Sequence, residues 1–346
     1  MSVTGKRKGL GLAAMSVASV LILTACGGDD DDGGNGGGDA AESVALQFAN
    51  SYPVEHPHNT CGAEVVADTL AEGDSGVEIE IFPNSELGPD AERFASVASG
   101  DIDIDIQGSS AISASFPEVG ALDAAYAFAD VDELFEFVDS DDFEGLKERL
   151  LEATGVRVLD VWYFGMRHFT ANQPIRSPED FEGQRMRFPD SPQYLMNAEA
   201  LGADATPVAF EEVFLALQQG TIDGQENPVP TIRDLNLPEV QSHVSLTGHQ
   251  VGSVLAIISE DTWQSLSEEQ QEAVQAAISD TRDGDRQCVE DAEQEIVDEW
   301  KSSGEMTVVE DVDLETFQAQ AEEFFMSNYD GDQLALYEAI RESAGG

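Results

Sequence analysis

A long helical pattern near the end of the chain limits what this sequence can fold into. The segment "SEEQQEAVQAAISDTRDGDRQCVEDAEQEIVDEWKSSG" occupies residues 267–304. It starts with the spacing of a capping box, Ser267 followed by Gln270, and it ends at Gly304, a residue typical of helix C-termini. If Gly284 does not break it, the helix has about 35 residues and spans about 50 Å. A single lobe of ~150 residues is shorter than that, so the pattern predicts a helix that braces two lobes.

Strand and helix patterns alternate along the chain before this segment. "SVALQFANSYP", "GVEIEIFPNSELG" and "VRVLDVWYFG" have the patterns of strands, with Val44, Leu46 and Phe48 on one face of the first. "TCGAEVVADTLAE", "VDELFEFVDS" and "FEGLKERLLEATG" have helical patterns. This alternation predicts an α/β fold with largely parallel sheets. The roughly 300 residues after Glu42 are too many for one core of typical size, so we expect two lobes.

The segment "GDIDIDIQG" alternates three aspartates with three isoleucines from Asp101 to Ile106. One interpretation is a calcium-binding loop, but that loop needs glycine at its sixth position, where Ile106 stands. We therefore expect a strand whose isoleucines face the core and whose aspartates face water.

The N-terminus has the features of a secretory signal. Three basic residues at positions 6–8 precede an apolar run from Leu10 to Ala25, which is too short for a membrane span. The final "LTAC" resembles the bacterial lipobox, and this resemblance implies cleavage after residue 25 and a lipid on Cys26. The alternative is an ordinary signal peptide with an incidental cysteine. We expect an extracytoplasmic protein, lipid-anchored at the outer face of the cytoplasmic membrane and touching the membrane only through its anchor.

Residues 26–42 after the signal contain "GGDDDDGGNGGGDA", which has no apolar residue before Ala40. Such a segment buries nothing and is typical of a solvated tether. Its four consecutive aspartates could bind a metal ion; we favour the interpretation that they extend the tether by mutual repulsion.

The net charge excludes several classes of partner. The whole chain has 69 acidic and 16 basic residues, and three of the basic ones lie in the signal. The mature chain therefore has 13 basic residues and a net charge of -56. Such a protein does not bind nucleic acid or an anionic membrane. The composition suits a salt-loving host, in which salt screens the repulsion; an acidic secreted protein without that adaptation is the alternative.

Two cysteines remain after Cys26, namely Cys61 and Cys288. An even number of cysteines in an oxidising compartment is compatible with one disulfide. The sequence gives no distance between them, so two separate thiols are an equal alternative.

Two arginines stand close together in "FEGQRMRFPD", although the chain is poor in cations. In a strand, Arg185 and Arg187 share one face. Arg187 lies next to Phe188 and Pro189, where the strand should end, and ligands of α/β proteins bind beyond the carboxyl ends of strands. We therefore expect Arg187 to hold an anion with its planar guanidinium and Arg185 to pair with surface acids.

The region around these arginines resembles a known family. The segment from "WYFGMRHFTANQP" through "LALQQGTIDGQENPVPTI" strongly resembles the dicarboxylate-binding type of solute-binding subunits of tripartite ATP-independent periplasmic (TRAP) transporters. The resemblance extends upstream through "FPNSELGPD" and downstream to "PEVQSHVSLTGH". It implies a two-lobed periplasmic-binding-protein-like α/β fold with a cleft between the lobes and the long helix bracing both. Residues 43–164 plus about 253–290 would form lobe I, and residues 165–252 plus about 291–346 would form lobe II with the C-terminal helices.

The resemblance also implies roles for single residues. Arg187 matches the principal carboxylate-clamping arginine, and Arg167 matches a second cleft arginine, with a buried structural brace as its alternative. Phe210 matches an aromatic residue that packs on the ligand, unless it is core. Asn227 matches a ligand-binding amide, unless it caps the turn before Pro228. Asp90 matches a polar cleft residue, unless it is a helix N-cap.

One position departs from the family pattern and bears on the ligand. Some members place an acid after the third strand, where this chain has Gln107 and Ser109. The departure puts amino-sugar ligands in doubt and leaves sugar acids and C4-dicarboxylates open.

The resemblance implies a protein that captures an organic carboxylate and delivers it to TRAP membrane permease subunits. We expect a monomer without enzymatic activity, cofactor or bound metal. Two alternatives belong to other classes. His56 and His58 could ligate a metal in a metal-uptake protein, or Cys61 could be the nucleophile of a secreted hydrolase with one of these histidines as its base. No serine-elbow, zinc-binding His-x-x-x-His or phosphate-loop motif accompanies them.

Overall fold

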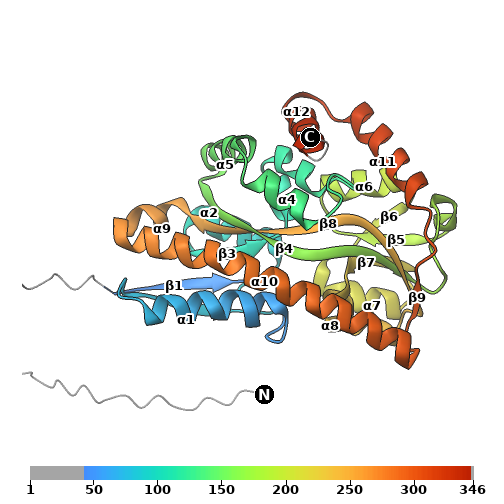
Figure 1. The fold of residues 1–346 in the computed structure, drawn as a ribbon, viewed down its shortest axis with the longest axis horizontal. Helices are drawn as coiled ribbons and strands as arrows, with labels where there is room; N and C mark the ends of the chain where they lie inside the picture. Colours follow the sequence, from blue (N-terminus) through green and yellow to red (C-terminus); the bar gives the residue numbers. More distant parts are fainter. Residues whose placement is uncertain (1–42, 344–346) are drawn as a thin grey trace, which may run out of the picture. The chain divides into compact units, whose positions relative to one another are not determined.

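The computed structural model describes residues 43–343 (Figure 1). The expected signal peptide (residues 1–25), the lipidation site Cys26 and the tether up to residue 42 lie outside the described residues. Among the helices of the described part, none is both long and apolar enough to cross a membrane.

The described part of the chain contains nine strands, which form one sheet: β1 (Val44–Ala49), β2 (Val77–Phe82), β3 (Ile104–Gln107), β4 (Val156–Ala171), β5 (Arg185–Phe188), β6 (Asp204–Pro207), β7 (Gly224–Pro228), β8 (His243–Ser259) and β9 (Thr307–Val309). The α-helices are α1 (Glu64–Glu72), α2 (Asp90–Ser99), α3 (Ser109–Ser113), α4 (Val131–Val138), α5 (Asp141–Thr154), α6 (Pro192–Leu201), α7 (Val213–Gln218), α8 (Val229–Asp234), α9 (Glu260–Ser265), α10 (Glu268–Ser303), α11 (Leu314–Asn328) and α12 (Gly331–Ser343). The expected α/β class is therefore correct.

The sheet is continuous and mixed, in the order β2-β1-β3-β8-β4-β7-β5-β6, with β9 paired to β8. Its outer pairs β1–β2, β1–β3, β5–β6 and β5–β7 are parallel, as the alternation of strands and helices predicts. The expectation of largely parallel sheets is wrong for the centre, where β4 and β8 are antiparallel. The reason is that the chain crosses from one end of the sheet to the other along β4 and returns along β8.

Two glycines allow the central strands to come close together. Gly165 of β4 pairs with Gly252 of β8 at a shift in register after Tyr163. A Cβ atom on Gly252 would lie 2.7 Å from the carbonyl oxygen of Gly165, and Gly165 itself has a φ of +116°. A side chain at either position would therefore force the strands apart.

The long helix forms as its pattern predicts. Helix α10 begins with a capping box between Ser267 and Gln270, runs through position 284 without a break, and ends at Gly304 in the left-handed conformation. It contacts α1 near one end of the sheet and α8 and β9 near the other (Figure 1). Its buried side chains enter three hydrophobic clusters of the described residues, through Ile278, Val289 and Trp300. The helix therefore braces both ends of the sheet.

The aspartates of "GDIDIDIQG" do not form the expected water-facing side of a strand. Strand β3 covers only Ile104–Gln107, and Asp105 is fully buried. Helix α2 covers this face and places Arg93 there, whose Nε donates to Oδ2 of Asp105 at 2.9 Å. Asp103 accepts hydrogen bonds from the backbone of Gln47 and from Thr262. The prediction of a wet face is wrong because an arginine in the neighbouring helix compensates a buried charge.

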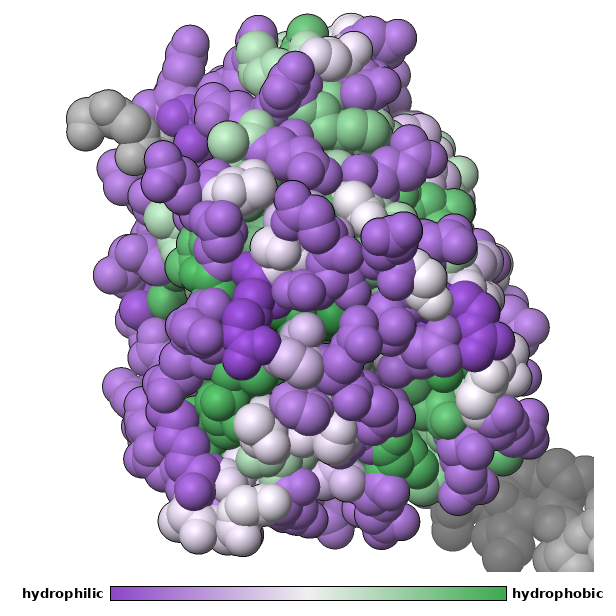
Figure 2. All heavy atoms as spheres, turned by 90° about the vertical axis from the view of Figure 1, so that its right-hand side faces the viewer, coloured by the Kyte–Doolittle hydropathy of each residue, from purple (hydrophilic) through white to green (hydrophobic). Residues whose placement is uncertain are grey.

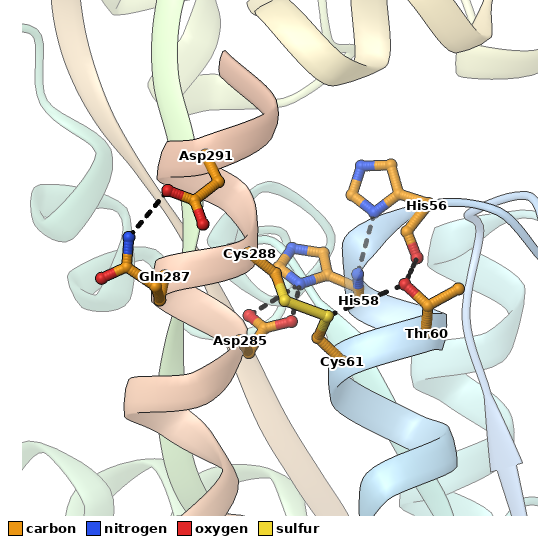
Figure 3. Close-up of a disulfide and its surroundings, with 8 residues drawn as sticks. All are labelled: His56, His58, Thr60, Cys61, Asp285, Gln287, Cys288 and Asp291. Atoms are coloured by element: carbon orange, nitrogen blue, oxygen red, sulfur yellow. Dashed lines mark hydrogen bonds and ion pairs between the residues drawn. A yellow bond between two sulfur atoms is a disulfide. The ribbon is translucent and has the colours of Figure 1, made fainter. Parts of the chain in front are cut away.

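A disulfide joins Cys61 to Cys288, which decides between the two alternatives that the sequence left open (Figure 3). It links the π-helical turn His58–Ala63 before α1 to the middle of α10. Beside it, the buried His58 lies 3.0 Å from the carboxylate of Asp285, also on α10. A covalent bond and a polar contact thus hold the first helix against the long helix.

Candidate functional site

Five of the six residues that the sequence singled out for ligand binding line one cavity of about 70 Å³. They come from segments far apart in the chain: Asp90, Arg167, Arg187, Phe210 and Asn227. Asp90, Arg187 and Phe210 also line an adjoining cavity of about 200 Å³. The sixth residue, Gln107, lies outside the lining of both.

Arg187 is a buried cation that forms no ion pair with an acid in residues 43–343. Its side chain lies on β5, one residue before the strand ends, and the residue is 3% exposed. Within residues 43–343, its guanidinium has one hydrogen bond, in which Nε donates to the carbonyl oxygen of Val208 at 2.9 Å. Burial lowers the pKa of Arg187 to about 10; the charge of Glu226 opposes this shift, and that of Arg167 reinforces it. The group remains charged at neutral pH, and its remaining N–H donors suit a carboxylate.

Arg185, two residues earlier, is a surface residue. Its Nε and Nη2 donate to the two carboxylate oxygens of Asp223, both at 2.8 Å. About half of its side chain is exposed. The expectation that Arg185 pairs with a surface acid is therefore confirmed.

Arg167 lines the cavity, but its charge is already compensated. Its Nε and Nη2 bind Oε2 and Oε1 of Glu226 at 2.5 and 2.8 Å, and both residues are buried. Nε2 of His249 lies 3.3 Å from the same carboxylate. Burial opposes the charge of Glu226, but Arg167 and His249 outweigh it and lower the pKa of Glu226 to about 2. The contacts thus support the bracing role that was the alternative for Arg167, although the residue also lines the cavity.

Asn227 lies in β7 with its side chain in the cavity wall. Its Oδ1 accepts from Arg167 at 3.2 Å, and its Nδ2 donates to Gln225 at 2.6 Å. The cap of the following helix is Pro228. The turn-capping alternative for Asn227 is therefore wrong, and its amide is held in place by neighbours on two strands.

Asp90 and Gln107 belong to one polar cluster. Asp90 is the first residue of α2, and the N-cap is Pro89, so the N-cap alternative for Asp90 is wrong. Its Oδ1 accepts hydrogen bonds from Ser51 and from Arg93. Gln107 donates to the carbonyl oxygen of Asp90 at 2.9 Å. Gln107 therefore supports the wall from behind.

Phe210 is partly exposed, so the alternative of a plain core residue does not hold. The other lining residues were missed by the sequence analysis: Ser51, Tyr52, Gly108, Ser110, Phe164, Pro189, Tyr194 and Ser253. Ser51 and Tyr52 follow the end of β1, so the strand-end rule that indicated Arg187 would have indicated them as well. No local pattern marks Tyr194 or Ser253, because their place in the wall depends on packing between α6 and β8.

The residues on which the two alternative functions depend have other contacts in the structure. Cys61 forms the disulfide and has no thiol to act as a nucleophile. His56 and His58 are buried, and Nδ1 of each has a partner within the protein. Among the described residues, no group of three or more histidine, cysteine or acidic side chains is placed to hold a metal ion.

An α/β fold with a mixed sheet, a helix that braces both ends of this sheet, and a cavity lined by a buried arginine are the features of a solute-binding protein of the two-lobed periplasmic class. The chain belongs to family 7 of the bacterial extracellular solute-binding proteins, whose family model matches residues 48–331. It is 37% identical over 243 residues to the sialic acid-binding periplasmic protein SiaP of Vibrio cholerae, covering 70% of this chain and 76% of SiaP. It is 31% identical to the 2,3-diketo-L-gulonate-binding periplasmic protein YiaO of Escherichia coli, covering 72% of this chain and 76% of YiaO.

Solved structures of TRAP periplasmic solute-binding proteins have the same fold. One from Roseobacter denitrificans, with bound L-galactonate, has a TM-score of 0.80 and 32% identity, covering 87% of this chain and 99% of that one. Another from Polaromonas, bound to D-erythronate, has a TM-score of 0.80 and 29% identity, covering 87% and 98%. The chain is thus an extracytoplasmic solute-binding protein of the TRAP type.

Proposed function

We propose that this protein captures a small organic carboxylate on Arg187 and delivers it, chemically unchanged, to the membrane permease subunits of a TRAP transporter. One observation carries the proposal: the guanidinium of Arg187 is buried in the cavity wall and has no acid partner among the described residues. A buried, uncompensated charge is costly, and a bound carboxylate removes that cost with two parallel hydrogen bonds.

The rest of the cavity wall supports a sugar acid or C4-dicarboxylate as the class of ligand. Five of the residues that line the cavity have hydroxyl side chains, namely Ser51, Tyr52, Ser110, Tyr194 and Ser253. Hydroxyls both donate and accept hydrogen bonds, which suits a ligand with hydroxyls of its own. The named ligands of several relatives, among them L-galactonate and D-erythronate, are hydroxylated carboxylates.

Binding would act by closing the two lobes over the ligand. In our proposal residues 43–164 plus about 253–290 form lobe I, and residues 165–252 plus about 291–346 form lobe II. The cavity takes Asp90 from the first and Arg187 from the second. A ligand that contacts both favours the closed state by its differential affinity, and the permease recognises that state.

Anchoring, oligomeric state and salt adaptation complete the proposal. The lipobox-like residues before Cys26 support a lipid anchor, and the tether up to residue 42 supports a body held at the outer face of the cytoplasmic membrane. We propose a monomer, since delivery to a permease needs one free body for each ligand. The acidic composition supports a salt-loving host.

A thermal-shift screen with organic acids tests the proposed function. We expect sugar acids or C4-dicarboxylates to raise the melting temperature, because a ligand that binds only the folded state stabilises it. Neutral sugars of the same carbon number are the matched controls and should have no effect, since they lack the carboxylate. A panel in which no organic acid shifts the melting temperature, even at millimolar concentration, would contradict the proposal.

A further inference from the structure

The lining of the candidate site has one cation that no acid pairs with and several acids. We call the cavity of about 70 Å³ the inner cavity and the adjoining cavity of about 200 Å³ the outer cavity. Arg187 lines both and forms no ion pair among the described residues, while the charge of Arg167 is neutralised by Glu226. Asp90 also lines both cavities, and Asp190 and Glu211 line the outer one.

Asp90 contacts one arginine, Arg93, and shares it with a second carboxylate. Arg93 donates from Nη2 to Oδ1 of Asp90 at 2.9 Å and from Nε to Oδ2 of Asp105 at 2.9 Å. One guanidinium thus serves two carboxylates. Asp105 is fully buried behind the wall, whereas 43% of the Asp90 side chain is exposed toward the cavities and solvent. The part of this cluster that a ligand meets is therefore a carboxylate.

This arrangement separates two classes of ligand that Arg187 alone would accept equally. When one carboxylate lies on Arg187, the rest of a short ligand occupies the two cavities that Arg187 and Asp90 both line. A hydroxyl at the far end of the ligand donates a hydrogen bond to a carboxylate. A second carboxylate would instead face Asp90, Asp190 and Glu211, and among the residues that line the two cavities no uncompensated cation other than Arg187 is present to receive it.

We propose that the site selects hydroxylated monocarboxylates of the aldonate class against dicarboxylates of the same length, and that Asp90 is the residue that sets this selectivity. The inference rests on the proposed function, because it assumes that a carboxylate binds Arg187. It narrows the ligand to one of the two classes that the cavity wall supports.

Calorimetry with pairs of ligands that differ only at the far end tests the inference. D-erythronate is compared with meso-tartrate, and L-galactonate with galactarate; in each pair a terminal CH2OH is replaced by a carboxylate. The titrations are done at about pH 8, where both ligand carboxylates are ionised. We expect the monocarboxylate that binds to do so at least about tenfold more tightly than its partner, since juxtaposed like charges strongly disfavour binding.

Asp90→Asn tests the assigned residue, because it removes the charge and keeps a side-chain oxygen for Ser51 and Arg93. We expect weaker binding of the monocarboxylate, tighter binding of the dicarboxylate, and a ratio of affinities reduced by about tenfold. Glu92→Gln is the matched control: Glu92 is exposed on the same helix and lines neither cavity, so the ratio should not change. If Asp90→Asn fails to fold, Glu211→Gln, an exposed residue of the outer cavity, should reduce the ratio in the same direction.

Measuring the selectivity at high salt distinguishes an effect of the cavity wall from an effect of the protein's overall charge. Selectivity that persists in about molar salt supports the inference, because contacts within a few ångströms are screened least. Three outcomes would overturn the inference and leave the proposed function standing. The selectivity could vanish in molar salt, or dicarboxylates could bind as well as monocarboxylates. Glu92→Gln could also reduce the ratio of affinities as much as Asp90→Asn does. If no organic acid of any class binds, the proposed function fails, and this inference fails with it.

Discussion

Arg167 and Glu226 form a two-pronged ion pair inside the protein, with N–O distances of 2.5 and 2.8 Å. The pair determines which cation of the cavity is available to a ligand. Because Glu226 compensates Arg167, the charge without an ion-pair partner among the described residues belongs to Arg187, whose Nε donates to the carbonyl oxygen of Val208. We therefore propose different roles for the two arginines: Arg167 holds the cavity wall together, and Arg187 binds the ligand.

The first prediction concerns the different contributions of Arg187 and Arg185 to ligand binding. Arg187→Ala should weaken binding of the carboxylate by about 2–5 kcal/mol, because a charge-assisted pair in a desolvated site is lost. Arg187→Lys should restore binding only in part, since an ammonium cannot form two parallel hydrogen bonds. Arg185→Lys is the control and should change affinity by less than about 1 kcal/mol, because it alters an exposed ion pair. Calorimetry with any acid found in the thermal-shift screen measures the affinities of all three variants. Full affinity in Arg187→Lys together with loss of binding in Arg185→Lys would mean that the carboxylate-binding role was assigned to the wrong arginine.

The second prediction concerns pH and Glu293 of α10. Its carboxylate accepts hydrogen bonds from the backbone of Met166 at 2.7 Å and from Tyr163 at 3.2 Å. Burial, reinforced by the charge of Glu290, raises its pKa from 4.5 to about 7. A raised carboxyl pKa means that the folded protein holds the proton more tightly, so this group favours folding most below about pH 4.5 and less as pH rises to about 7.

Glu293→Gln should therefore raise the free energy of unfolding by about 1–2 kcal/mol above pH 7 and change it little at about pH 4.5. Denaturant unfolding at several pH values measures the difference. Glu295→Gln, an exposed neighbour on the same helix, is the control for the loss of one negative charge. If both variants raised the free energy of unfolding equally, the effect would be due to overall charge.

The third prediction concerns the disulfide between Cys61 and Cys288. It closes a loop with a sequence separation of 227 residues. Replacing both cysteines by serine should lower the free energy of unfolding by about 2–5 kcal/mol, because the unfolded chain regains conformational freedom. A reducing agent should destabilise the natural protein to a similar extent and leave the double variant unchanged. Equal sensitivity of both proteins to the reductant would argue against the bond.

The fourth prediction concerns salt. The mature chain has a net charge of -56, and hydrophilic side chains cover most of the face shown in Figure 2. Repulsion between these charges destabilises the folded state, and salt screens it. The melting temperature should therefore rise with sodium chloride up to molar concentrations. A neutral osmolyte at equal osmolality is the control, and a flat or falling salt curve would contradict adaptation to salt.

The fifth prediction concerns the anchor. If the lipid is attached to Cys26, the full-length protein should fractionate with membranes, and Cys26→Ser should release it, because the remaining contacts of a strongly acidic body with a membrane are unfavourable. Fractionation of cells and medium measures this. The natural protein found free in the medium would show that the cysteine is incidental.

The sequence by itself determined the elements whose signals are local. Ser267, Gln270 and Gly304 fixed the ends of α10, because caps depend on residues within one turn. The position of Arg187 before Phe188 and Pro189 indicated the end of a strand, which is where α/β proteins bind ligands. The family resemblance added the neighbours of Arg187, and four of them do line its cavity.

Only the tertiary structure decided how charges and cysteines are paired. Asp105 is buried because Arg93 of another element covers it, and Arg167 is compensated by an acid 59 positions away. Cys61 reaches Cys288 because α1 packs against α10. Arg185 and Arg187 have the same residue type and the same strand face, yet one is exposed and one is buried. Electrostatic pairing depends on distances between segments that are remote in the chain, and these distances exist only once the sheet and its helices have packed.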